Sequence, residues 1–297
     1  MLAFDLGVLS RKAHVISTRE AASWSAVWIV VSLMFNSVLF MWLGNEKALE
    51  FFTGYVIEKS LSVDNMFVFA LIFSYFNIPA ILQPKVLKWG ILGALVMRMM
   101  LILVGSAVLE AFHWVIWVFG SALILTGARM MLQKEVHVAP EKNVAVRLLK
   151  RVVPVTEELR GERFFSKQNA VTFATPLLIA LVVIETTDLI FALDSIPAIF
   201  AITTDVFIVY TSNIFAVLGL RSLYFLLSGA IRSFRYLKAG LAIVLVFVGF
   251  KMLLSDYYSI PIVVSLALVA GILGFCILVS WASRGTGQVK GWSLSIF

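Results

Sequence analysis

The chain has 297 residues, of which 61% are hydrophobic and only 14% charged, and its mean hydropathy is +0.98. Soluble domains contain about 25% charged residues, so this composition excludes an ordinary soluble domain and indicates an integral membrane protein. The net charge of +7 raises the question of nucleic-acid binding, which the distribution of basic residues decides below. A single cysteine, Cys276, excludes an internal disulfide.

Eight apolar segments are long enough to cross a bilayer, which takes about 20 residues. They lie at 22–43, 48–76, 86–109, 113–132, 170–195, 206–230, 237–255 and 260–282. The sequence therefore predicts an all-α, polytopic bundle of about eight transmembrane helices in a single membrane domain, 1–297. A long polar loop, 133–168, separates the fourth and fifth segments. Within it, residues 144–153 predict either an amphipathic helix on the membrane surface or a solvated loop helix.

With eight spans, the lysines and arginines of the connecting segments fall on one side of the membrane, and the opposite side carries only Lys47. Basic loops remain in the cytoplasm, so both termini and the 133–168 loop are predicted to be cytoplasmic. The positive charge is then a topology signal with some attraction to anionic lipid, and no nucleic-acid partner is required. The sequence makes no prediction of the oligomeric state.

Three pairs of matching segments indicate an internal repeat. Glu58 and Asp64 have the same spacing as Asp188 and Asp194, Gly93–Arg98 is similar to Ala216–Arg221, and Thr126–Leu132 is similar to Val248–Leu254. The repeats are predicted at 48–132 and 170–255, with 22–43 and 260–282 as peripheral spans. Each repeat holds three spans, an odd number, so the second repeat must enter from the opposite side. This inverted topology is common in secondary transporters.

The apolar repeats contain a set of carboxylates that is costly to place in a bilayer and is usually kept for function. The predicted metal ligands are Glu58, Asp64, Glu185, Asp188 and Asp194, with supporting roles for Ser62, Asn65, Thr187, Ser195, Arg98 and Arg221. Oxygen donors without thiolates or imidazoles favour Mn²⁺, Mg²⁺ or Ca²⁺. Five buried anions also require bound cations or protons, which is a physical basis for proton-coupled exchange.

Two further expectations concern the geometry of these acids. Pro197 removes a backbone donor, so the helix is expected to unwind near Asp194 and turn it toward the ion. The alternative to a transport site is a set of structural ion pairs, with Glu58 paired to a neighbouring base and Asp188 to Arg221. Arg98 and Arg221 are expected to be partners of the acids and not ion ligands.

Three motifs in the chain resemble the TerC family, and within it the Alx-type members. They are Glu58–Asn65, Glu185–Ala198 and Thr211–Arg221, and the similarity extends from about residue 20 to 282. The resemblance implies an inner-membrane protein of the LysE-like transporter group, connected with Mn²⁺ export and, by older naming, with tellurium resistance. The family's acidic residues fall on the five carboxylates above. Family members of this type carry a further N-terminal span, which implies that Met1–Gly7 is the end of that helix.

The function favoured by the sequence is therefore export of a divalent cation, most of all Mn²⁺, by a multi-pass protein of the bacterial inner membrane. Ca²⁺ and Mg²⁺ are the other candidate ions, and the protein is not expected to be an enzyme. One alternative is a non-transporting scaffold or a redox, stress or tellurium-resistance modulator, although one cysteine offers little redox chemistry. Another is an intramembrane aspartyl protease, but the Gly-x-Gly-Asp and Tyr-Asp motifs of that class do not occur.

Overall fold

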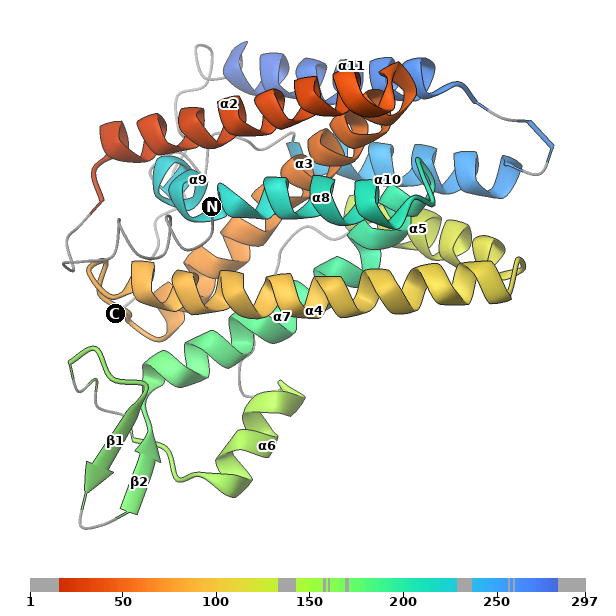
Figure 1. The fold of residues 1–297 in the computed structure, drawn as a ribbon. Coiled ribbons are helices and arrows are strands. Elements are labelled where there is room, and N and C mark those ends of the chain that lie inside the picture. The colour runs from red at the N-terminus through yellow and green to blue at the C-terminus, as the bar shows by residue number, and fades with distance from the viewer. Residues whose placement is uncertain are drawn as a thin grey trace.

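The computed structural model describes residues 16–132, 143–156, 159, 161–168, 171–228, 237–255, 257–258 and 260–282. Its elements are α2 (Thr18–Leu43), α3 (Asn45–Tyr75), α4 (Gln83–Ala111), α5 (Val115–Leu132), α6 (Val144–Val152), β1 (Phe165–Gln168), β2 (Val171–Ala174), α7 (Pro176–Phe200), α8 (Val206–Leu218), α9 (Leu220–Ser228), α10 (Leu237–Leu254) and α11 (Ile262–Ala282). The long helices form a bundle, and α6 with the strands β1 and β2 lies below it in this view, beside the start of α7 (Figure 1).

In the described part of the chain, five helices are long and apolar enough to cross a membrane, α2, α4, α5, α7 and α11, and the number is six if the bent pair α8–α9 forms one span. The outer helices α2, α4 and α11 expose large apolar side chains such as Met41, Val104 and Phe275, which a soluble surface rarely gathers into extended areas. The predicted all-α, multi-pass membrane fold is confirmed. Each predicted span coincides with one helix or, at 206–230, with a helix pair, while the number of crossings stays a prediction.

The predicted fifth span begins too early. Residues 171–174 form β2, which pairs antiparallel with β1 so that Phe165 lies opposite Ala174. The alternation of Val171-Thr-Phe-Ala174 is typical of a strand, and α7 begins only at Pro176, a position that proline favours at a helix start. The prediction of a helix from residue 170 was therefore wrong, because the length of the apolar run concealed a short hairpin.

Helix α6 packs against the helix bundle through one of its faces. Val146 is fully buried, and both Val146 and Leu149 pack into the largest apolar cluster. Asn143 caps α6 and donates from Nδ2 to the Thr186 hydroxyl on α7 at 3.1 Å. The loop helix therefore covers the first half of α7.

The expected unwinding at Pro197 does not occur. Helix α7 continues through Pro197 to Phe200, and the Ala201 amide donates to the Pro197 carbonyl. Because the proline lies in the last turn, only the hydrogen bond to the Leu193 carbonyl is lost, and buried neighbours keep the turn helical. The prediction that Pro197 redirects Asp194 was therefore wrong.

A break occurs instead at Gly219, in the segment predicted as one continuous span. Helices α8 and α9 meet there at 42°. Lys59 of α3 donates from Nζ to the Ala216 carbonyl at 3.0 Å, and a Cβ on Gly219 would lie 2.7 Å from that Nζ. A freed carbonyl at membrane depth needs a partner inside the protein, and Lys59 supplies it.

Helices α5 and α10 pack closely through small residues. An added Cβ on Gly249 would lie 2.7 Å from the Gly120 carbonyl oxygen, and one on Gly127 would lie 2.7 Å from the Ala242 oxygen. The sequence offset of 122 between the Thr126–Leu132 and Val248–Leu254 segments relates Gly120 to Ala242 and Gly127 to Gly249. These two contacts are therefore exchanged by the predicted repeat, as a twofold relation between α5 and α10 requires.

Substitution of these glycines tests the packing. Gly127→Ala and Gly249→Ala are expected to lower the thermal unfolding midpoint in detergent by several degrees, because the methyl group meets backbone atoms that cannot move alone. Gly271→Ala in α11 is the matched control, since nothing lies within 4 Å of its added Cβ. Equal midpoints for all three variants would contradict this account of the contact.

Candidate functional site

The centre of the bundle holds an arginine between two carboxylates. Arg98 of α4 donates from Nε and Nη2 to the two oxygens of Asp188 on α7, at 3.1 and 3.0 Å. Its Nη1 contacts Glu58 of α3 and the Asn213 amide oxygen of α8, the latter at 3.1 Å. Arg98 and Glu58 are both only 1% exposed. The planar guanidinium thus joins four helices, and its fork matches the carboxylate geometry of Asp188.

Asn65 completes this cluster. Its Nδ2 donates to Asp188 Oδ1 at 3.3 Å, so Asp188 accepts hydrogen bonds from both the arginine and the amide. The Glu58 Oε2 atom, in contrast, has no hydrogen-bond partner among the described residues. Both oxygens of Asp188 therefore accept hydrogen bonds, while one oxygen of Glu58 accepts none from the described residues.

A cavity of about 430 Å³ borders the cluster. Its polar lining comprises Glu58, Asn65, Arg98, Thr126, Arg129, Asp194, Ser195 and Lys238. Asp194 accepts from the Thr126 hydroxyl at 3.0 Å, and the Ser195 hydroxyl is buried without a partner in the described part of the chain. Arg129 and Lys238 come from the ends of α5 and α10 that adjoin the basic loops. The cavity therefore extends from the cluster toward the side predicted to be cytoplasmic.

Other predicted site residues do not line this cavity, and the side chain of one of them, Asp64, is not among those that the structure describes. The Glu185 carboxylate packs against Gly93 of α4, where an added Cβ would come within 2.1 Å of it, and its Oε2 is unpaired among the described residues. Thr187 donates to the Val183 carbonyl of its own helix at 2.6 Å. The Asp64 side chain lies outside the described residues.

Ser62 and Arg221 are both buried. The Ser62 hydroxyl has no partner in the described part of the chain, and Arg221 belongs to α9. The alternative in which Asp188 pairs with Arg221 is replaced by the bidentate pair with Arg98. The sequence predicted Arg98 as a supporting residue and did not predict its position between the two acids.

Among the hydroxyl and amide side chains of the site, Thr126 and Asn213 were not predicted. Both lie in segments singled out by the sequence, Thr126 at the start of a repeat match and Asn213 in the third motif. A signal was present, because a hydroxyl or amide inside an apolar span is itself unusual. Hydroxyl and amide groups cost less in a bilayer than charged groups do, so they are a weaker signal of a site.

A preformed cluster of metal ligands is absent from the described side chains: no three of His, Cys, Asp and Glu come together there. The physical reason is that Arg98 lies between Glu58 and Asp188. The donors that do border the cavity are carboxylate, amide and hydroxyl oxygens, which suit hard divalent ions. These residues can coordinate such an ion only if the Arg98 guanidinium moves away from the space between Glu58 and Asp188.

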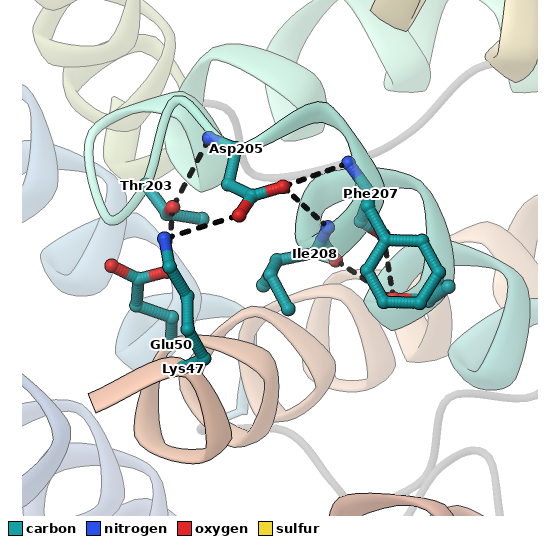
Figure 2. Close-up of polar contacts among 7 residues, drawn as sticks. Lys47, Glu50, Thr203, Asp205, Phe207 and Ile208 are labelled. Atoms are coloured by element: carbon teal, nitrogen blue, oxygen red, sulfur yellow. Dashed lines mark hydrogen bonds and ion pairs between the residues drawn. The ribbon is translucent and has the colours of Figure 1, made fainter. Parts of the chain in front are cut away.

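On the opposite side of the bundle, a second polar network joins the start of α3 to the α7–α8 connection (Figure 2). Lys47 binds Glu50 at 2.9 Å and Asp205 at 3.2 Å, and the Thr203 hydroxyl donates to Glu50 at 2.7 Å. Burial opposes the charged form of Lys47, which precedes the predicted span, but the two carboxylates outweigh it and raise its pKa. Asp205 also caps α8 by accepting from the Phe207 amide. This network connects the two predicted repeats.

Apolar side chains separate the cavity from a second hollow on that side. The second hollow, of about 530 Å³, is lined by residues that include Glu110, His113, Phe200 and Met252. Between the two, Leu123, Ala198 and Val248 are at most 1% exposed and belong to one apolar cluster. The central acids are thus sealed from the outer hollow by packed side chains.

Comparison with known proteins identifies the family. Residues 43–288 match the Integral membrane protein TerC family. The chain belongs to this family. A Myxococcus xanthus protein described as an uncharacterized membrane protein is 53% identical over 94% of this chain and 88% of its own length. An Escherichia coli K12 protein provisionally named membrane-bound redox modulator Alx is 47% identical over 98% of this chain and 94% of its own. No solved structure matches.

The different partners of Asp188 and Asp194 predict different effects on stability. Asp188→Asn breaks the bidentate ion pair of a fully buried guanidinium and is expected to cost about 3 kcal/mol or more. Asp194→Asn retains an oxygen that accepts from Thr126, so a loss below about 1 kcal/mol is expected. Thermal unfolding of both purified variants measures the difference. A larger loss for Asp194→Asn would contradict the geometry described above.

Proposed function

We propose that this TerC-family protein is a divalent metal-cation transporter of the bacterial inner membrane, which exports Mn²⁺ in preference to Ca²⁺ or Mg²⁺. The observation that carries the proposal is the buried pair Glu58 and Asp188 held together by a cation, the Arg98 guanidinium, at the edge of a cavity. A positive charge between two buried carboxylates offsets their mutual repulsion. A place that holds one cation in this way is suited to hold another.

The arrangement of the openings supports alternating access. The cavity extends toward the basic side, while the apolar seal and the Lys47–Glu50–Asp205 network close the opposite side. An inverted repeat places such a site between two triplets of spans, α3–α5 and α7–α10, that can rock against each other. The exchanged glycine contacts of α5 and α10 are those expected from this repeat. In this proposal the structure is the inward-facing state.

In this proposal, proton transfer by buried carboxyl groups is coupled to metal export. Asp194 and Glu185 lie at membrane depth, and neither forms a salt bridge among the described residues. Buried acids of this kind can exchange protons for cations. Protons that enter as the metal leaves would drive export against a gradient.

The other functions receive less support. An aspartyl protease needs two acids that share a proton, whereas here Glu58 and Asp188 are bridged by an arginine. The provisional name of the Escherichia coli relative suggests redox modulation, but the one thiol of this chain, Cys276, is buried. A scaffold would tolerate neutral substitutions of the acids as long as the protein folds.

Metal flux in inverted membrane vesicles tests the proposal. Vesicles with the wild-type protein should accumulate Mn²⁺ when a pH gradient is applied, and Asp194→Asn vesicles should accumulate no more than vesicles without the protein. Asp194→Asn is chosen because it is expected to fold. Equal Mn²⁺ flux in the variant and the wild type would reject the site, and no flux of Mn²⁺, Ca²⁺ or Mg²⁺ in the wild type would reject the function.

The proposed orientation has a separate test in a Cys276→Ala background. Met130→Cys, in the cavity lining, should react with a membrane-impermeant thiol reagent in inverted vesicles but not in right-side-out vesicles. Ser106→Cys, in the lining of the outer hollow, should show the opposite pattern. Labelling of Met130→Cys only from the outside would overturn both the topology and the inward-facing assignment.

A further inference from the structure

We propose that Arg98 is a tethered counter-cation: in this state its guanidinium occupies the place between Glu58 and Asp188 into which the transported metal binds, and it must leave that place when the ion arrives. The inference rests on the proposed transport function and assigns to the arginine a competitive role in it. A purely structural role would make Arg98 a permanent link between α3, α4 and α7.

The contacts of Arg98 resemble those of a bound ion. Its three donor nitrogens face Glu58, Asp188 and Asn213, which are all oxygen donors, and all of these groups are at most 3% exposed. Every one of these oxygens is also a suitable ligand for a hard divalent cation. The guanidinium thus lies among oxygen atoms of the kind that a hard divalent ion binds.

Charge balance favours the exchange. Two carboxylates and one guanidinium leave one uncompensated negative charge in a buried place, which is costly at low dielectric. A divalent ion in place of the guanidinium neutralises both carboxylates. The unpartnered Oε2 of Glu58 marks the coordination that the arginine leaves unfilled among the described groups.

The displaced guanidinium has an alternative partner within the same cavity. Arg98 and Asp194 both line it, and the described contacts of the Asp194 carboxylate include one hydrogen bond, from Thr126 to Oδ1. The long arginine side chain can therefore turn from Asp188 toward Asp194 without leaving the protein or losing a carboxylate. Such a movement links ion binding on α3 and α7 to the position of α4.

A competing arginine also explains how the ion is released. If Arg98 returns to Asp188, it restores the bidentate pair and expels the metal, so the site does not hold its cargo permanently. Without the arginine, the two acids should bind the ion more tightly and release it poorly. Affinity and transport should then change in opposite directions, which a structural ion pair does not predict.

Binding of Mn²⁺ to the purified full-length protein in detergent tests the inference, with free Mn²⁺ measured by electron paramagnetic resonance. Arg98→Gln is expected to bind Mn²⁺ about 10-fold more tightly than wild type, while its flux in inverted vesicles falls. Glu58→Gln is expected to bind more weakly than wild type. Arg147→Gln, on the exposed face of α6, is the matched removal of a positive charge and should bind as wild type does.

Arg98→Lys guards against misfolding of the glutamine variant. Lysine keeps the charge but cannot form the bidentate pair, so it competes less well and should raise the affinity about 3-fold. The inference is overturned if folded Arg98→Gln binds Mn²⁺ no more tightly than wild type. If the glutamine variant does not fold, the same result in Arg98→Lys overturns it. The transport proposal stays intact in either case as long as the wild-type protein binds Mn²⁺. Wild-type protein that neither binds nor moves a divalent ion instead rejects the transport proposal itself.

Discussion

The structure depends on one interaction, the buried guanidinium of Arg98 between Glu58 and Asp188. Two carboxylates and an arginine in the middle of a membrane bundle are unfavourable separately and become stable only together. Their contacts draw α3, α4, α7 and α8 to a common centre. Loss of Arg98 leaves two buried carboxylates without compensation, so the fold and the site have the same origin.

Around this centre, a cavity lies on one side and packed apolar side chains lie on the other. The α5–α10 pair, packed glycine against backbone, borders the cavity and contributes to the seal beyond it. The break at Gly219 is stabilised by Lys59 from the neighbouring helix, which places an irregular segment next to the charged cluster. Broken spans in membranes occur where they line a cavity or are buried in protein, and here the break is buried against α3.

Much of this could be read from the sequence, and the failures have physical causes. Apolar length predicted the helices, because the cost of exposed backbone and charge in lipid leaves few alternatives, and the resemblance of three motifs indicated the family. Strand β2 and the break at Gly219 were missed because apolar length says nothing about local backbone geometry, and Pro197 misled because its position in the last turn was unknown. The acids Glu58 and Asp188 were found by their cost in a bilayer. Arg98 was expected to be a partner of the acids, but its particular partners were not assigned, since which charges meet depends on how the helices pack.

The most direct test of the account is the location of Mn²⁺ relative to Arg98, measured by anomalous diffraction at the manganese edge from crystals of the protein grown with the ion. The account predicts an anomalous peak within coordination distance of Glu58 and Asp188, about 2.2 Å from their oxygens, with the Arg98 guanidinium turned away from Asp188. A peak elsewhere in the bundle, or a bound ion with the bidentate Arg98–Asp188 pair still in place, would contradict it.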